Sequence, residues 1–342
     1  FRIVPLLIVA GVVIFLLHKK DPSSRSRAIF HLAILTFFAL IVFLPLLRYA
    51  QEHPQEFAFR AFSRLGDWER PLPGPAWQIF LKNLWNAMII FAWDNGVVWT
   101  ISIPNRPALD MISAALFYIG LLLVSYRYVR QRNWQDLFLI ISIPILMLPS
   151  VLSLAFPDEN PVLNRTAGAI VPVFIIIGLA LEGLLNTIRS RWNSAGGTRL
   201  AWGIGILLLA WSASLNFELV FNKYQQGYRD SSWNSSEMDR VIKDFIKLTG
   251  EPDNAWIFSY PHWVDTRLVG LNIGLPMKDY AITIEQLPST LQQGGPKLFL
   301  VNPQDETALS ALQAQYPLGW SQAYVSSYAN KDFIVFSVPP QE

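Results

Sequence analysis

The placement of basic residues between long apolar runs constrains this chain more than any other feature. Ten of the eighteen Lys and Arg residues in positions 1–220 fall into three short polar gaps, Lys19–Arg27, Arg127–Arg132 and Arg189–Arg199. Short loops rich in Lys and Arg stay on the cytoplasmic side of a membrane. The pattern therefore predicts six spans, with a long loop at 48–110 and the C-terminal region outside the cytoplasm.

Composition supports a chain divided between two solvents. Of its 342 residues, 52% are hydrophobic and 15% are charged, against about 25% charged in an average soluble domain. Residues 1–220 carry 18 basic and 12 acidic side chains, a balance of +6, whereas residues 221–342 carry 9 and 13, a balance of −4. We expect a polytopic membrane domain at 1–220 and a small extracytoplasmic α/β domain at 221–342. Because the chain has no cysteine, disulfides and thiolate metal sites are excluded.

The predicted spans differ in how well their lengths suit a bilayer, since a helix needs ~20 residues to cross the ~30 Å hydrocarbon layer. They are Phe1–Leu17, Ala28–Leu47, Met111–Tyr126, Leu137–Phe156, Thr166–Ile188 and Leu200–Phe217. Ala28–Leu47 and Leu137–Phe156 each supply 20 residues without a charge, whereas Met111–Tyr126 supplies 16. The chain opens on Phe1 inside an apolar run, without an initiator Met or a signal-peptide pattern, so we interpret it as a fragment or a processed chain.

The apolar segment Ala76–Trp93 in the long loop decides the topology. Four polar residues recur there at helical spacing and form one stripe, namely Gln78, Lys82, Asn83 and Asn86. Such a stripe predicts a helix lying in the membrane interface. The alternative, a seventh span, inverts every later segment and places two of the basic gaps outside, against the basic-inside bias.

The C-terminal region alternates between short strand patterns and helical ones. Asn234 and Glu237 form a predicted capping box that opens an amphipathic helix ended by Gly250. Strands are predicted at Trp256–Tyr260, Ala281–Ile284, Leu298–Val301, Trp320–Val325 and Phe333–Val338, with helices at Trp263–Leu271, Glu285–Gln293 and Asp305–Gln315. This alternation favours a small α/β sheet with an antiparallel edge.

Arginines in the outer segments are the first candidates for chemistry. Arg60 and Arg64 lie four residues apart on the helical stretch Pro54–Leu65, so both guanidinium groups project from one face and can grip a lipid-linked phosphate. The alternative is that they hold membrane lipid headgroups. The sequence leaves both interpretations open.

Two further arginines stand at predicted entries into spans. Arg106 lies in Ile103–Asp110, where two prolines enforce an extended approach that forms either a site wall or a plain entry turn. Arg165 lies at the predicted N-terminus of the fifth span, where the helix dipole favours an anion, and is the leading candidate for phosphate contact. Neighbouring Asp158 and Glu159 have no third acidic or His residue beside them, so no metal site is expected.

The C-terminal region offers one group of candidate contacts. Within Tyr260–Arg267, His262 and Trp263 are suited to contact an acceptor or a sugar ring, although a His at the start of a helix is more often a capping or packing residue. The region contains no GxGxxG or GxxxxGK[ST] motif, so we expect no nucleotide cofactor. A nucleic-acid partner is likewise not expected.

Four segments follow one another in an order that carries a resemblance. They are Arg60-Ala61-Phe62-Ser63, Phe91-Ala92-Trp93-Asp94-Asn95, Ile103–Asp110 and Asn164–Pro172. Their order across Arg60–Leu185 resembles the C-terminal half of bacterial polytopic glycosyltransferases of family 39, which include protein O-mannosyltransferases and lipid A aminoarabinose transferases. This chain has Asn105 where the family commonly has a Gly, which bears on the local turn.

The resemblance implies a C-type glycosyltransferase fold in the cell membrane. Such a protein transfers a sugar from a polyprenyl-phosphate donor to an extracytoplasmic acceptor, and its catalytic carboxylate belongs to a first outer loop that this chain lacks. The catalytic residue is therefore unknown here, and Arg165 and Arg106 match the family's pattern as phosphate contacts. The alternatives are a non-catalytic membrane subunit that binds a partner or an envelope glycan, and a polysaccharide polymerase or ligase.

Overall fold

The chain divides into two compact units in the computed structural model, Phe1–Gln225 and Gln226–Glu342. The structure describes residues 3–19, 21–66, 68–192, 195–249 and 251–340, without the side chains of residues 60 and 61. The division lies close to the predicted boundary at residue 220. We call the first part the membrane unit and the second the C-terminal unit, and describe each by itself.

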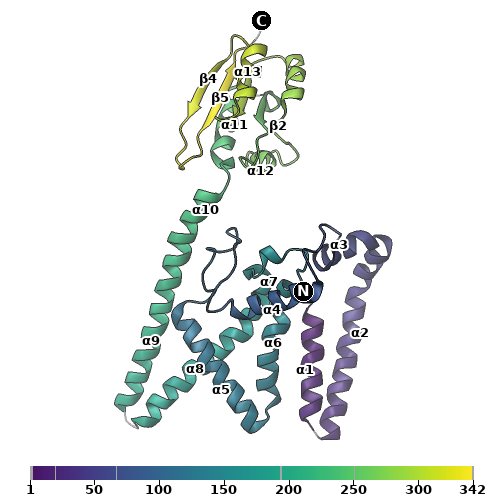
Figure 1. Ribbon diagram of the computed structural model, residues 1–342, viewed down its shortest axis with the longest axis vertical. Coiled ribbons are helices and arrows are strands. Elements are labelled where there is room, and N and C mark those ends of the chain that lie inside the picture. The colour runs from purple at the N-terminus through teal and green to yellow at the C-terminus, as the bar shows by residue number, and fades with distance from the viewer. Residues whose placement is uncertain (1–2, 20, 67, 193–194, 250, 341–342) are drawn as a thin grey trace. The chain divides into compact units, whose positions relative to one another are not determined.

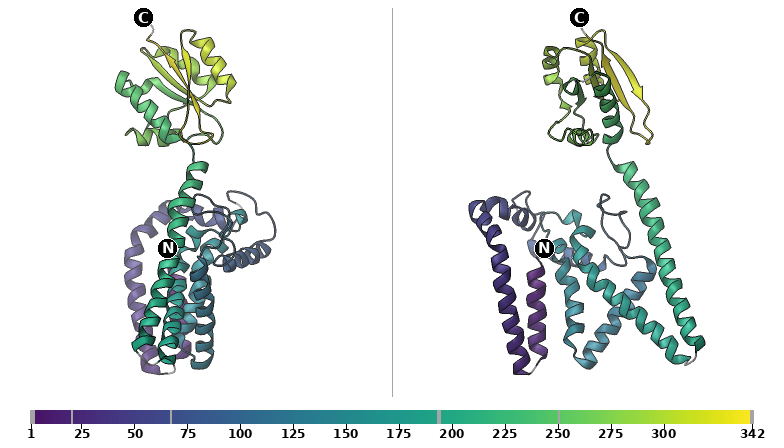
Figure 2. Two further views of the ribbon diagram at one scale, coloured as in Figure 1. Left: turned by 90° about the vertical axis from the view of Figure 1, so that its left-hand side faces the viewer. Right: turned by 180° about the vertical axis from the view of Figure 1, so that it is seen from behind.

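Helices make up the regular structure of the membrane unit (Figure 1). They are α1 (Val4–His18), α2 (Pro22–Glu52), α3 (Pro54–Leu65), α4 (Ala76–Ile89), α5 (Met111–Gln131), α6 (Trp134–Val151), α7 (Leu163–Thr166), α8 (Ile170–Arg191) and α9 (Ala195–Phe217), which continues into a π-helical segment, η3 (Glu218–Tyr224). The facing ends of α1 and α2, of α5 and α6, and of α8 and α9 carry most of the described residues of the three basic gaps and lie at one end of this unit. The helices α3, α4 and α7 lie at the other end (Figures 1 and 2).

Five helical segments among the described residues are long and apolar enough to cross a membrane. They are Pro22–Glu52, Met111–Gln131, Trp134–Val151, Leu163–Arg191 and Ala195–Ser231. The span predicted at Phe1–Leu17 corresponds to α1, which has 15 residues, fewer than the ~20 that a crossing needs. Six spans are therefore not confirmed, although the protein has the helices of a membrane-embedded chain.

The core of the membrane unit lies where α4, α5, α6 and α8 meet. Phe117 of α5, Met147 of α6 and Ile176 of α8 are buried there. Gly120 permits the close approach of α5 to α8, because a Cβ atom at this position would lie 2.5 Å from the Ile176 carbonyl oxygen. By contrast, α2 has no buried residue, as expected of a helix that is surrounded by lipid.

The two asparagines of the α4 stripe face inward, which the sequence analysis did not predict, whereas Gln78 and Lys82 are exposed. Asn83 is buried, and its Nδ2 donates to the Val151 carbonyl oxygen at 3.1 Å, while Asn86 Nδ2 donates to the Asn160 carbonyl oxygen at 3.5 Å. The opposite face exposes four large apolar side chains, Trp77, Leu81, Trp85 and Met88. The asparagines face inward because α6 ends at Val151, five residues before the predicted end. The carbonyl groups of its last turn and of the loop that follows therefore need hydrogen-bond donors.

The C-terminal unit is built on one five-stranded sheet of order β2-β1-β3-β5-β4. Its strands are β1 (Ala255–Phe258), β2 (Ala281–Ile282), β3 (Lys297–Val301), β4 (Trp320–Tyr324) and β5 (Phe333–Val338). β1 runs parallel to β2 and β3, and β5 runs antiparallel to β3 and β4. The small C-terminal sheet with an antiparallel edge, predicted from the sequence, is thus confirmed.

Helices cover both faces of this sheet (Figure 2). On one face, α11 (Ser235–Thr249) and α12 (Thr266–Asn272) pack against the sheet; on the other lie α13 (Glu306–Gln315) and η5 (Ile284–Gln292). The segment η5 is 3₁₀ rather than α-helical, with Pro288 inside it. Asn234 Oδ1 accepts from the Glu237 amide at 3.4 Å, which is one of the two bonds of the predicted capping box, and the Glu237 carboxylate accepts from Nδ2 of Asn234 at 2.7 Å.

Candidate functional site

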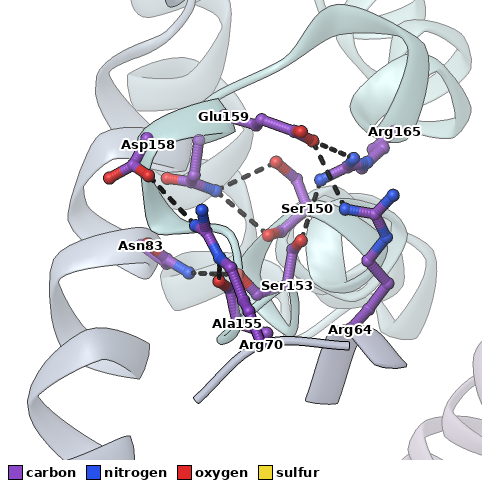
Figure 3. A network of polar contacts seen from close by, with 10 residues as sticks. Arg64, Arg70, Asn83, Ser150, Ser153, Ala155, Asp158, Glu159 and Arg165 are labelled. Carbon is purple, nitrogen blue, oxygen red and sulfur yellow. Dashed lines mark hydrogen bonds and ion pairs between the residues drawn. The ribbon is translucent and has the colours of Figure 1, made fainter. Parts of the chain in front are cut away.

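The predicted phosphate contacts Arg64 and Arg165 lie in one network of ion pairs (Figure 3). Glu159 accepts from Arg165 and lies 3.7 Å from Nη1 of Arg64. Arg165 Nη1 also donates to the hydroxyl of Ser153 at 2.8 Å. Both arginines are about three-quarters buried, with side-chain exposures of 26% for Arg64 and 23% for Arg165.

Arg70, which the sequence analysis did not single out, completes this network. It forms an ion pair with Asp158 at 3.0 Å and donates to the Ala155 carbonyl oxygen. The guanidinium carbons of Arg64 and Arg70 lie 3.8 and 4.2 Å from the centre of the Phe156 ring, within the range of cation–π attraction. We call Arg64, Arg70, Arg165, Asp158 and Glu159 the arginine network.

The arginine network has its own counterions, which limits what else it can bind. Three arginines face two carboxylates, and each arginine has a carboxylate within 4 Å. A phosphate at Arg165 would have to displace Glu159 from a charge-assisted contact. The network joins the end of α3 and the segment after it to α7 and the loop between α6 and α7, so its clearest role is structural. Among the described residues, no group of three His, Cys, Asp or Glu side chains has the arrangement of a metal site.

Arg106 lies in a different environment, in the loop between α4 and α5. Two stretches of this loop pair with each other, since the Asn95 amide donates to the Arg106 carbonyl at 2.8 Å and the Asn105 amide to the Gly96 carbonyl at 2.9 Å. Asn105 adopts a φ of 55°, a left-handed conformation that Asn tolerates better than most residues. Asn105 therefore makes the turn that a Gly would make, so the absence of the Gly common in family 39 does not prevent the turn.

Arg106 lines a cavity of about 570 Å³ between the start of α5 and the α9–η3 segment. The cavity is mostly apolar, with Met111 and Ala114 of α5 on one side and Trp211 and Leu215 of α9 on the other. Lys223 of η3 also lines it. We call this space the Arg106 cavity. A second, narrower cavity of about 260 Å³ shares Leu109, Asp110 and Asn216 with it and extends between α5 and α8.

Asp110 fixes the wall of the Arg106 cavity. Its Oδ1 accepts from the amides of Ile112 and Ser113, and its Oδ2 accepts from the hydroxyls of Ser113 and Ser212 and from Nδ2 of Asn216, at 2.6–3.1 Å. Burial raises the pKa of Asp110, but these hydrogen bonds outweigh it, so the pKa lies below its ordinary value. With five donors on about four lone-pair sites, this carboxylate has no capacity left to act as a base.

The positive charge of Arg106 has no close counterion. Among the residues that the structure describes, no carboxylate lies within ion-pair distance of its guanidinium group. Partial burial lowers the pKa of Arg106, and the charge of Asp110 opposes that shift. The guanidinium remains protonated because an arginine side chain is not deprotonated in a protein. The cavity thus combines an unneutralised cation with apolar walls.

The other candidates are dispersed. The side chain of Arg60 lies outside the described part of the chain. In the C-terminal unit, His262 is exposed on the turn after β1 with a φ of 53°, and Trp263 is half-buried and packs against the core beside α11 and α12. The sequence analysis did not identify Lys223 as a candidate. Its spacing from Asn216 and Leu219 nevertheless places all three residues on one side of a helix.

Comparisons with known proteins do not identify this chain. No family model, no curated protein and no solved structure matches it. The resemblance to family 39 glycosyltransferases therefore stays a prediction from the sequence, and the geometry of the Arg106 cavity is the main guide to function.

Proposed function

We propose that this chain is part of a membrane glycosyltransferase that uses a polyprenyl-phospho-sugar donor, and that Arg106 contacts the donor phosphate. The observation that carries the proposal is the half-buried Arg106 beside an apolar cavity, without a carboxylate at ion-pair distance among the described residues. Such a donor has a small anionic group attached to a long apolar chain. The Arg106 cavity offers the same two chemistries side by side.

The size and continuity of the cavities favour a lipid-linked ligand over a small soluble anion. Together, the Arg106 cavity and its neighbour run between α5, α8 and α9 and are lined mainly by apolar side chains. Lys223 adds a second cation on the α9–η3 side of the phosphate position. In this proposal Arg165 holds the loop between α6 and α7 in place, and does not bind the donor directly.

The proposal places the donor on the extracytoplasmic side of the membrane. The helix ends that carry the basic gaps gather at one end of the membrane unit, and the loop between α4 and α5, which contains Arg106, lies at the other end (Figure 1). With the basic end in the cytoplasm, this loop lies on the extracytoplasmic side. A C-terminal tag that is protected from protease in intact spheroplasts would contradict this orientation.

The same cavity also suits a non-catalytic, lipid-binding role. Asp110 is the one carboxylate among its lining residues, and all its acceptor capacity is occupied. A transferase needs a base for the acceptor hydroxyl, so the base must come from elsewhere in the full protein. If a full-length protein that binds polyprenyl-phospho-sugar releases no polyprenyl phosphate with any acceptor, a lipid-binding subunit becomes the better description.

Binding of polyprenyl phosphate to the purified chain in nanodiscs tests the phosphate contact. Arg106→Gln should weaken binding about tenfold, because a charge-assisted hydrogen bond is lost, whereas Arg165→Gln should leave the affinity of the folded protein unchanged. Phosphatidylglycerol in excess serves as the competitor that separates a specific site from general headgroup binding. Equal affinities of Arg106→Gln and the parent protein would refute the assignment of Arg106.

A further inference from the structure

A polar cavity of about 630 Å³ lies in the C-terminal unit, at the edge of the sheet where β1 and β2 begin. Trp256 of β1 is half-buried and lines it. The Phe299 ring stacks on the indole at 4.9 Å with an angle of 17° between the planes. The cavity is far from His262 in the topology, because His262 follows the opposite, carboxyl end of β1. We call it the Trp256 cavity.

One wall of the Trp256 cavity is held in place by buried side chains. Lys297 is 2% exposed, and its ammonium donates to the carbonyl oxygens of Gln293 at 2.6 Å and Gly295 at 3.2 Å. Asn254, 4% exposed, donates to the Gly294 carbonyl oxygen between them at 2.7 Å. Three consecutive carbonyl groups therefore point inward, and the loop that bears the Gln293 side chain is pre-organised.

The charges of the cavity limit the class of ligand. Glu251, Asp253, Asp279 and Lys278 line it, which gives a net charge of −2. Lys278 pairs with Asp253, and Asp279 accepts from the side chains of Thr266 and Arg267. The carboxylate of Glu251 is exposed and accepts no hydrogen bond from the residues that the structure describes. An anionic ligand is disfavoured here, and a ligand rich in hydroxyl or amino groups is favoured.

We propose that the Trp256 cavity binds a neutral or amino-substituted saccharide. The indole supplies an apolar surface for the C–H face of a sugar ring. The Glu251 carboxylate accepts hydrogen bonds from the sugar hydroxyl groups, and the Gln293 amide both donates to them and accepts from them. The fixed loop lowers the entropy lost on binding. This proposal goes beyond the donor site and does not depend on it, since it concerns a separate unit and needs no lipid.

The test uses the full chain in nanodiscs and three soluble trisaccharides: maltotriose, a glucosamine trimer and a galacturonate trimer. Affinities are measured by calorimetry, and the amide signals of Gly294 and Gly295 are followed by NMR. We expect the neutral or the amino sugar to bind and to shift these two signals. Glu251→Ala and Gln293→Ala should each weaken that binding about tenfold, and neither side chain belongs to the packed core.

Two matched variants distinguish this cavity from other surfaces of the same unit. Glu306→Ala removes an exposed carboxylate on α13, and His262→Asn changes the side chain predicted from the sequence as a sugar contact while tolerating its φ of 53°. Neither should alter the affinity. The proposal is overturned if no trisaccharide binds, if the galacturonate trimer binds as tightly as the others, or if His262→Asn weakens binding and Glu251→Ala does not.

Discussion

The arginine network and the Arg106 cavity differ in whether their arginines have a carboxylate at ion-pair distance. In the network, Arg64, Arg70 and Arg165 are paired with Asp158 and Glu159. In the cavity, the only acidic lining residue, Asp110, is satisfied by hydroxyl and amide donors, and Arg106 has no close counterion among the described residues. In this chain, Arg106 is left available to a ligand because neutral donors occupy the nearby carboxylate of Asp110.

Asp110→Ala should give the largest effect on stability. It removes the acceptor of the Ser113 and Ser212 hydroxyls, whose loss costs about 1–3 kcal/mol for a buried group, and it removes the N-cap of α5. Asn216 keeps the Ser212 carbonyl oxygen as an acceptor. We expect a loss of about 2–4 kcal/mol, measured by thermal unfolding of the detergent-solubilised chain. Asp94→Ala, which removes a carboxylate bound to one amide, is the control. A loss no larger than that of the control would mean that Asp110 does not fix the cavity wall.

Glu237 tests the same principle in the C-terminal unit, through pH. Burial raises its pKa, but hydrogen bonds from Ser326, Ser327 and Asn234 outweigh it and lower the pKa to about 2. Because the folded pKa is below the unfolded value, this stabilisation is present above pH ~4.5 and is lost as the pH falls toward ~2. The protection of the Ser327 amide against hydrogen exchange, taken relative to the intrinsic exchange rate at each pH, should fall in this window by an amount equivalent to about 1–3 kcal/mol. Glu237→Gln should remove most of that pH dependence, and a persisting dependence would contradict the assignment.

Within the network, two carboxylates allow a matched comparison of buried and exposed pairs. Glu159→Gln leaves Arg64 and Arg165, both mostly buried, without their shared counterion, and we expect a loss of about 1–2 kcal/mol. Asp158→Asn breaks a pair whose carboxylate is 78% exposed, so the expected loss is under about 1 kcal/mol. Thermal unfolding of both variants checks the order. The reverse order would show that Glu159 does not organise the network.

Arg106→Gln should give the smallest change in the free energy of unfolding, smaller than that of Arg165→Gln. Its guanidinium has no ion pair to lose among the described residues, so the free energy of unfolding should change by less than about 0.5 kcal/mol. The same unfolding assay on Arg165→Gln should give a clear loss, because its contacts to Glu159 and Ser153 disappear. Similar losses for the two variants would remove the distinction between a structural and an available arginine.

The positions of most elements were predictable because local pattern determines them. Apolar runs of ~20 residues mark membrane-length helices, and the alternation after residue 250 predicted the strands β1 to β5 to within two residues at each end. The exceptions have physical causes. Leu137–Phe156 satisfies the length criterion, but α6 ends at Val151 and the chain turns there to form the loop that carries Asp158 and Glu159.

Hydrophobicity and its period along the chain were enough to predict the division into two units, the membrane-length helices and the small C-terminal sheet. Tertiary packing, by contrast, sets which arginines have a carboxylate partner and which way α4 turns its asparagines. Ion pairs such as Arg70 with Asp158 join residues 88 positions apart, and no local pattern encodes such contacts. The choice between Arg165 and Arg106 as the phosphate contact thus depends on packing rather than on spacing.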